Sequence, residues 1–242
     1  MRIDLNCDMG ESFGAWRMGD DETLLDIVTS ANIACGFHAG DPTVMEATVK
    51  AALRRGVAIG AHPSYPDLAG FGRRSMRIAP DELERIVLYQ IAALAGMAEA
   101  NGGKLAHVKP HGALYNDAAK DRALADAIAS AIKRHDATLT LVGLADSALI
   151  EAGRAAGLPT AAEGFCDRAY EADGSLRARE KAGAVFTDPV QAAEQALKLA
   201  QSGRIQTLCI HGDTPGAAGI ARAVRAALEK SGATIKALGR GP

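Results

Sequence analysis

Residues 31–41 have the sequence ANIACGFHAGD, in which an apolar run ends at a glycine and two ionisable side chains follow. Short apolar runs of this kind suit strands that are buried on both faces of a parallel sheet. His38 comes shortly after the turn at Gly36, and Asp41-Pro42 is typical of a helix start, with an N-cap before a first-turn proline. The stretch therefore predicts a strand, a turn that carries a site residue, and a capped helix.

The same order of elements recurs along the chain. Seven apolar runs are predicted strands: Ile3–Asn6, Ser30–Cys35, Val57–Ala61, Lys104–Val108, Thr138–Val142, Thr160–Glu163 and Thr207–Ile210. Helices are predicted from Pro42, from Pro80 to a C-cap at Asn101-Gly102-Gly103, over Ala118–Lys133, from Asp188-Pro189, and over Gly216–Lys230. This alternation predicts a parallel sheet, and about seven units predict a TIM-barrel-like (β/α)7 barrel in which residues 1–242 form one domain.

Composition argues against several classes of protein. The chain has 242 residues, 48% of them hydrophobic, and a formal net charge of -2 with scattered Lys and Arg, so nucleic-acid binding is not expected. No apolar stretch is long enough to predict a membrane span. The N-terminus lacks a signal-peptide pattern and the four cysteines show no CxxC pairing, which favours a reduced, cytoplasmic location with small buried cysteines. Neither a GxGxxG motif after the first strand nor a P-loop occurs.

Ionisable residues follow the predicted strands, and the loops at the carboxyl ends of barrel strands form the active sites of such folds. These residues give two groups of candidates. The predicted catalytic residues are Asp8, Glu11, His38, His62, Lys109 and His111. The predicted substrate-binding residues are Asp41, Arg73, Arg168, Tyr170, Arg179, His211 and Asp213.

Several of these residues also have a purely structural interpretation. Asp41 and Asp213 could be helix N-caps, Glu11 could cap the first crossover, and Lys109 could lie along the surface with its ammonium in water. His107 lies inside a predicted strand and is interpreted as a core histidine. A single histidine at a strand end is more often structural than catalytic, but four of them on one face with several carboxylates favour a site.

Histidines beside carboxylates suit general acid–base catalysis near neutral pH, which favours water activation or proton transfer on a carbonyl compound. Asp8, His38 and His62 could instead bind zinc or a related divalent ion. Ser64 gives only weak support for a serine nucleophile. The irregular stretch 164–187 is expected to cross the barrel mouth, either as a lid whose arginines bind a substrate carboxylate or phosphate, or as a solvated loop.

Six motifs together resemble the family of the A subunit of bacterial 5-oxoprolinase (ATP-hydrolysing). In chain order they are DLNCDMGESFGAW, SANIACGFHAGDP, GAHPSYPDLAGFGRR, HVKPHGALYN, DRAYEADGSLRAR and CIHGDTPGA. The resemblance implies a barrel related to sugar and polysaccharide deacetylases. It also implies ATP-driven opening of the lactam of 5-oxo-L-proline to L-glutamate, together with subunits B and C. ATP is expected as its magnesium complex, at a site that a partner subunit could hold.

This activity suggests a chemical route. A five-membered lactam is an unstrained amide, so phosphorylation of its oxygen would activate it, a carboxylate or histidine would deliver water, and Lys109 would stabilise the oxyanion. Two alternatives stay open. The chain could be a stand-alone metal-dependent hydrolase such as a deacetylase, or a non-catalytic subunit that only presents oxoproline to its partners.

Overall fold

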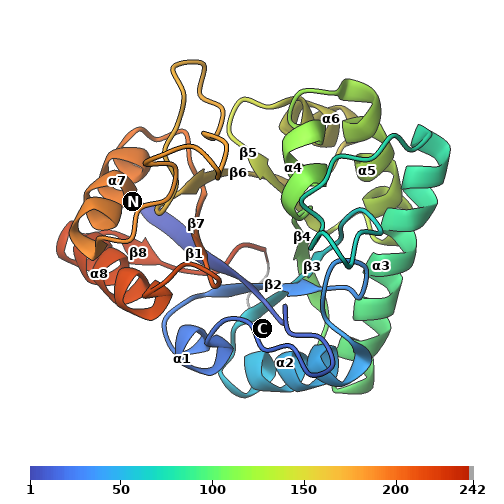
Figure 1. Cartoon of the computed structure of the whole chain (residues 1–242), viewed down its shortest axis with the longest axis horizontal. Helices are drawn as coiled ribbons and strands as arrows, with labels where there is room; N and C mark the ends of the chain where they lie inside the picture. The colour runs from blue at the N-terminus through green and yellow to red at the C-terminus, as the bar shows by residue number, and fades with distance from the viewer. Residues whose placement is uncertain (240–242) are drawn as a thin grey trace.

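The computed structural model describes residues 1–239 and contains a closed barrel of parallel strands (Figure 1). The barrel strands are β1 (Arg2–Met9), β2 (Ser30–Ala34), β3 (Ala58–His62), β4 (Leu105–Val108), β5 (Thr140–Leu144), β6 (Thr160–Phe165) and β7 (Thr207–His211). β1 pairs with both β2 and β7, which closes the sheet, and a short β8 (Thr234–Ile235) pairs with the start of β1. The predicted (β/α)7 barrel is confirmed.

Helices surround the strands on the outside of the barrel (Figure 1). They are α1 (Asp21–Leu25), α2 (Pro42–Arg54), α3 (Pro80–Ala100), α4 (Gly112–Ala118), α5 (Arg122–His135), α6 (Ala148–Ala156), α7 (Pro189–Gln201) and α8 (Ala217–Lys230). The predicted caps form at α2 and α7, where Asp41 and Asp188 accept hydrogen bonds from backbone amides of the first turn. Within residues 1–239, no helix combines the length and apolar character that crossing a membrane requires.

Two predicted boundaries are wrong in ways that matter for the site. β1 continues to Met9, so Asp8 lies in the strand rather than after it. The helix predicted over Ala118–Lys133 is two helices, because the Asp121 side chain accepts from the amides of Ala123 and Leu124 and starts α5 there. The resulting break follows α4, which itself begins directly after His111.

The apolar core lies between the barrel and its helices. Helix α3, for example, directs Leu83, Val87, Ile91 and Leu94 inward, and all four are fully buried. The four cysteines are buried and unpaired, as the sequence predicted.

The inside of the barrel is polar, although its strands were expected to be apolar on both faces. Asp4, Asn6 and Asp8 alternate with buried apolar residues along β1 and therefore share one face of the strand. Asp4 accepts hydrogen bonds from the hydroxyls of Ser30 and Thr207 at 2.6 and 2.5 Å. Paired polar groups can be buried at modest cost, so the strands tolerate this interior.

A second layer of polar contacts lies above Asp4. The Asn32 amide donates to Asn6 Oδ1 at 2.7 Å and to Asp8 Oδ1 at 2.8 Å, and His107 Nε2 lies 2.7 Å from Asn32 Oδ1. Gly60 makes room for this histidine, because a Cβ there would lie 2.0 Å from His107 Nε2. His107 is thus a core histidine, as predicted, and the layer supports Asp8 from below.

Candidate active site

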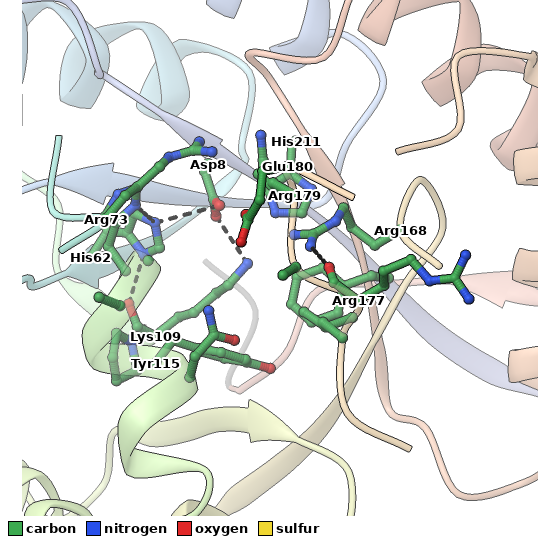
Figure 2. Close-up of a pocket in the computed structure, with 18 residues that line it drawn as sticks. Asp8, His62, Arg73, Lys109, Tyr115, Arg168, Arg177, Arg179, Glu180 and His211 are labelled. Carbon is green, nitrogen blue, oxygen red and sulfur yellow. Dashed lines mark hydrogen bonds and ion pairs between the residues drawn. The ribbon is translucent and has the colours of Figure 1, made fainter. Parts of the chain in front are cut away.

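A cavity of about 270 Å³ opens at the carboxyl end of the barrel (Figure 2). Strand ends and loops that are far apart in the chain both contribute to it. Its ionisable lining residues are Asp8, His62, Lys109, His111, His211, Arg73, Arg168, Arg177, Arg179 and Glu180. Parallel strands end at one rim, so the barrel brings these side chains to one pocket.

One side of the cavity, here called the β1–β4 wall, consists of Asp8, Glu11, His38, His62 and His111. His62 Nε2 lies 3.4 Å from Asp8 Oδ2 and 3.1 Å from His111 Nδ1. Glu11 Oε1 lies 3.3 Å from both His111 Nδ1 and His38 Nε2. The His38 ring stacks on the His111 ring with centroids 3.8 Å apart. The four residues predicted to converge, three of them histidines and one Asp8, are therefore brought together.

Burial and charge act in opposite directions on this wall. Burial would raise the pKa of Glu11, but hydrogen bonds from His111 and His38 hold it well below its ordinary value. Burial, followed by the neighbouring His111, lowers the pKa of His38 to about 3. The wall thus keeps its carboxylate ionised and its deepest histidine neutral.

Lys109 is the buried cation that joins the two sides of the cavity. Its Nζ lies 2.9 Å from Asp8 Oδ1, 2.9 Å from Glu163 Oε1 and 3.0 Å from Cys209 Sγ. Only 2% of Lys109 is exposed, so its interpretation as a surface side chain is wrong. Burial would lower the pKa of Lys109, but the charge of Asp8 raises it well above its ordinary value, and the ammonium stays charged.

The opposite side, here called the β6–β7 wall, carries a second carboxylate–histidine pair. His211 Nδ1 lies 2.9 Å from Asp167 Oδ1, and the Thr214 hydroxyl donates to Asp167 Oδ2 at 2.7 Å. Burial would raise the pKa of Asp167, but His211 holds it below its ordinary value. Among residues 1–239, His211 Nε2 has no hydrogen-bond partner, and His211 lines the cavity. A carboxylate that fixes Nδ1–H leaves Nε2 available as a proton acceptor.

Arginines from two loops cover the mouth beside this wall, as Figure 2 shows for Arg73, Arg168 and Arg179. Asp213 Oδ2 accepts hydrogen bonds from Arg73 at 2.6 Å and from Arg179 at 3.1 Å, which ties the 164–187 stretch to the loop after β3. Arg168 donates to the carbonyls of Arg177 and Ala184 within its own stretch. Burial, followed by Arg179, lowers the pKa of Arg168 to about 10.

Four predicted site residues lie elsewhere than expected. Asp41 caps α2 and accepts from Gly14 N at 2.7 Å, so the structure favours its structural interpretation over substrate binding. Tyr170 is outside the cavity lining, and its hydroxyl accepts from Phe165 N at 2.7 Å. His38 lies behind His111 rather than at the cavity. Asp213 holds arginines and caps no helix, since Gly216 precedes α8.

Other residues placed at the site were not predicted. Asp167 and Glu163 are not among the sequence-predicted site residues, although both belong to the sixth strand and the stretch after it, where polar residues were expected to gather. Residues 10–14, GESFG, match the Gly-x-Ser-x-Gly pattern of serine nucleophiles, which our sequence interpretation missed. Ser12 nevertheless lies outside the cavity, where its hydroxyl accepts from Met18 N at 3.0 Å. The structure thus gives no support to a serine mechanism at this position.

The chain is similar over nearly its whole length to named proteins of several organisms. It is 57% identical to the A subunit of 5-oxoprolinase from Methylococcus capsulatus, with 98% of this chain and 96% of that protein covered. It is 55% identical to the A subunit of 5-oxoprolinase from Heliobacterium modesticaldum, with 98% of each covered.

Solved structures agree with this similarity. The lactam utilization protein from Thermus thermophilus aligns with a TM-score of 0.92 at 46% identity, covering 98% of this chain and 100% of that one. A peptidoglycan N-acetylglucosamine deacetylase from Eubacterium rectale aligns with a TM-score of 0.55 at 12% identity, over 99% and 89% of the two chains, and this likeness concerns the fold alone. The model of the LamB/YcsF family matches residues 3–241. With its barrel, its site and its relatives in agreement, the chain belongs to the LamB/YcsF family.

Proposed function

We propose that this chain is the A subunit of an ATP-dependent 5-oxoprolinase, which opens the lactam of 5-oxo-L-proline to L-glutamate together with subunits B and C. The observation that carries this proposal is the 57% identity, over nearly the full length of both chains, to a protein named as the A subunit of 5-oxoprolinase. A relative that is named as one lettered subunit supports a multisubunit enzyme. The four unpaired cysteines and the use of ATP favour the cytoplasm.

The cavity suits a small substrate with one negative charge. Arg73 and Arg179 lie at its rim, and both already hold the Asp213 carboxylate. A substrate carboxylate is the kind of group that such guanidinium groups bind, through charge-assisted hydrogen bonds. The carboxylate of 5-oxoproline therefore binds at the arginines, and its lactam ring extends toward Asp8 and His211.

ATP supplies the driving force for a reaction that water alone performs poorly. Phosphate is transferred from ATP to the lactam oxygen, and ADP leaves. Water then attacks C5, the C5–N bond breaks with a proton passing to the nitrogen, and γ-glutamyl phosphate forms. A second water releases phosphate and leaves glutamate. The chain has no P-loop, so we assign the magnesium–ATP complex to a partner subunit.

His211 is the best-placed group to take the proton from the attacking water. Its Nδ1 is fixed by Asp167, and its Nε2 lacks a partner among residues 1–239. Lys109 is less suited to the oxyanion role expected from the sequence, because Asp8, Glu163 and Cys209 already surround its ammonium. We assign Lys109 to the fixing of Asp8 at the cavity instead.

The test is reconstitution with candidate subunits B and C, ATP and 5-oxoproline in ¹⁸O-labelled water. We expect glutamate formation only when all three subunits are present, with solvent oxygen in the new carboxylate. Glutamate formed at an unchanged rate without this chain would contradict the proposal. Unchanged turnover with His211→Ala would favour the alternative in which this chain only presents the substrate. Release of acetate from acetylated sugars by this chain alone would favour a deacetylase.

A further inference from the structure

The outer ring nitrogens of His62 and His111 determine where the hydrogens of these rings lie. His62 Nδ1 lies 2.7 Å from the carbonyl oxygen of Lys109, and His111 Nε2 lies 2.8 Å from that of Phe71. A carbonyl oxygen can only accept a hydrogen bond, so both of these nitrogens donate. In neutral rings, His62 Nε2 and His111 Nδ1 therefore carry a lone pair and no hydrogen.

These two lone-pair nitrogens face each other. They are 3.1 Å apart, and the ring planes meet at 87°, so both in-plane lone pairs can point at one position. Glu11 Oε1 lies 3.3 Å from His111 Nδ1, and Asp8 Oδ2 lies 3.4 Å from His62 Nε2. Four acceptor atoms thus surround one small region, and they repel one another unless a positive charge lies between them.

The spacing of these atoms indicates what kind of charge fits. Zinc binds histidine nitrogens at about 2.0–2.1 Å in tetrahedral sites, which separates neighbouring ligand atoms by roughly 3.3 Å. The distances of 3.1 and 3.3 Å around His111 Nδ1 are close to that separation. One ligand atom from each of Glu11, His38, His62 and His111 lies within 4.8 Å of the others.

The charges around this region show the same deficit. Three carboxylates, Asp8, Glu11 and Glu163, are at least 93% buried and face a single buried ammonium, that of Lys109. When they are ionised, two negative charges are left without compensation. Uncompensated buried charge is strongly unfavourable, and one divalent cation balances it.

We propose that His62 and His111 bind a divalent transition-metal cation, with Glu11 as the third ligand and Asp8 in reach as the fourth. Two imidazoles with carboxylates are ligands that suit zinc and related ions. The Lys109 and Phe71 carbonyls orient the two imidazoles from outside, as the surroundings of metal-bound histidines commonly do. This site goes beyond the proposed ring opening and does not depend on it.

His38 has a different part in this site. Its ring is parallel to that of His111, at an interplanar angle of 8° and a centroid distance of 3.8 Å. Two parallel stacked rings cannot aim in-plane lone pairs at one ion, so His38 is a positioning residue whose Nε2–H donates to Glu11. The set Asp8, His38 and His62 suggested by the sequence is replaced by His62, His111 and Glu11.

The test uses the tag-free full chain, treated with a chelator and then titrated with Zn²⁺, and with Co²⁺ as a spectroscopic probe, without ATP or partner subunits. We expect one metal per chain by mass spectrometry and visible Co²⁺ bands from nitrogen and oxygen ligands. His62→Ala and His111→Ala lose the stoichiometric metal. His38→Ala keeps it with an affinity weakened about 10–100-fold. His135→Ala, at the end of α5 and outside this cluster, binds as the parent does.

Absence of stoichiometric Zn²⁺ and Co²⁺ from the folded parent chain would overturn the proposal, as would unchanged binding in both His62→Ala and His111→Ala. If either alanine variant fails to fold, ¹⁵N NMR of the parent histidines decides. Zn²⁺-induced shifts of His62 Nε2 and His111 Nδ1 support the site, and a proton held between them in the presence of Zn²⁺ overturns it. The readouts use this chain alone, so failure of the ring-opening assay leaves this result unaffected, and the reverse also holds.

Discussion

The two walls of the cavity hold their histidines in different ways. On the β1–β4 wall, both ring nitrogens of His62 and of His111 have a protein atom in contact. On the β6–β7 wall, Asp167 holds Nδ1 of His211, while Nε2 has no partner among residues 1–239. One wall is built to hold charge in place, and the other can exchange a proton with a ligand in the cavity. Residue type alone does not distinguish these roles, since both walls combine carboxylates with imidazoles.

Removal of the cation that joins the two walls has the largest expected effect. Lys109→Met leaves Asp8 and Glu163 buried without their partner, which costs about 3–5 kcal/mol in the free energy of unfolding. Urea unfolding followed by circular dichroism measures the loss. Lys104→Met changes an exposed lysine before β4 and is the matched control, with a change within about 0.5 kcal/mol. Equal unfolding midpoints for the two variants would show that Lys109 is not a buried structural charge.

A change on the β6–β7 wall should affect catalysis more than stability. His211→Ala removes the proposed base, so kcat of the reconstituted enzyme falls by roughly 10²–10⁴-fold, with KM for oxoproline little changed. Asp167→Asn lowers kcat in the same direction, because it no longer fixes the histidine through an ionised carboxylate. Steady-state kinetics measures both effects, with His135→Ala as the control. A change in KM alone would assign this wall to binding.

The arginines at the mouth should affect binding more than turnover. Arg179→Ala removes a charge-assisted contact to the substrate carboxylate, worth about 1.5 kcal/mol or more, so KM rises by roughly tenfold or more. The matched control is Arg177→Ala, whose guanidinium pairs with Glu171 and points away from the other site residues in Figure 2. KM values that rise equally in both variants would argue that the stretch matters through its fold and not through Arg179.

The smallest effect is expected outside both walls. Asp41→Ala removes the N-cap of α2 and should lower the free energy of unfolding by about 1 kcal/mol, with kcat unchanged. Thermal unfolding and the reconstituted assay together measure this pair of results. A large loss of kcat at normal stability would restore Asp41 as a substrate-binding residue.

The sequence was sufficient for the order of elements because apolar runs and helix caps are local signals. The caps at Asp41 and Asp188 formed as predicted, and so did the left-handed turn at Gly102 after α3. The polar barrel interior was not predicted, since alternation of Asp4, Asn6 and Asp8 with apolar residues does not reveal which face turns inward. Only closure of the barrel brings Asn6 to Asn32 and Thr207.

The site was predictable as a set of residues but not as a set of contacts. Strand ends identified Asp8, His62, Lys109, His111 and His211, because the rim of a parallel barrel gathers them. The pairing of His211 with Asp167 could not be predicted, since it joins residues 44 positions apart across β6 and β7. Whether a ring lies at the cavity or behind another ring, as with His111 and His38, depends on side-chain rotamers that the sequence does not display.

The most direct test of the account is a crystal structure of this chain with 5-oxo-L-proline. The account predicts the ring in the cavity between Asp8 and His211, with its carboxylate within hydrogen-bond distance of Arg73 or Arg179 and its lactam carbonyl carbon facing His211 Nε2. A ring bound outside this cavity, or one whose carboxylate points toward His62 and His111, would contradict it.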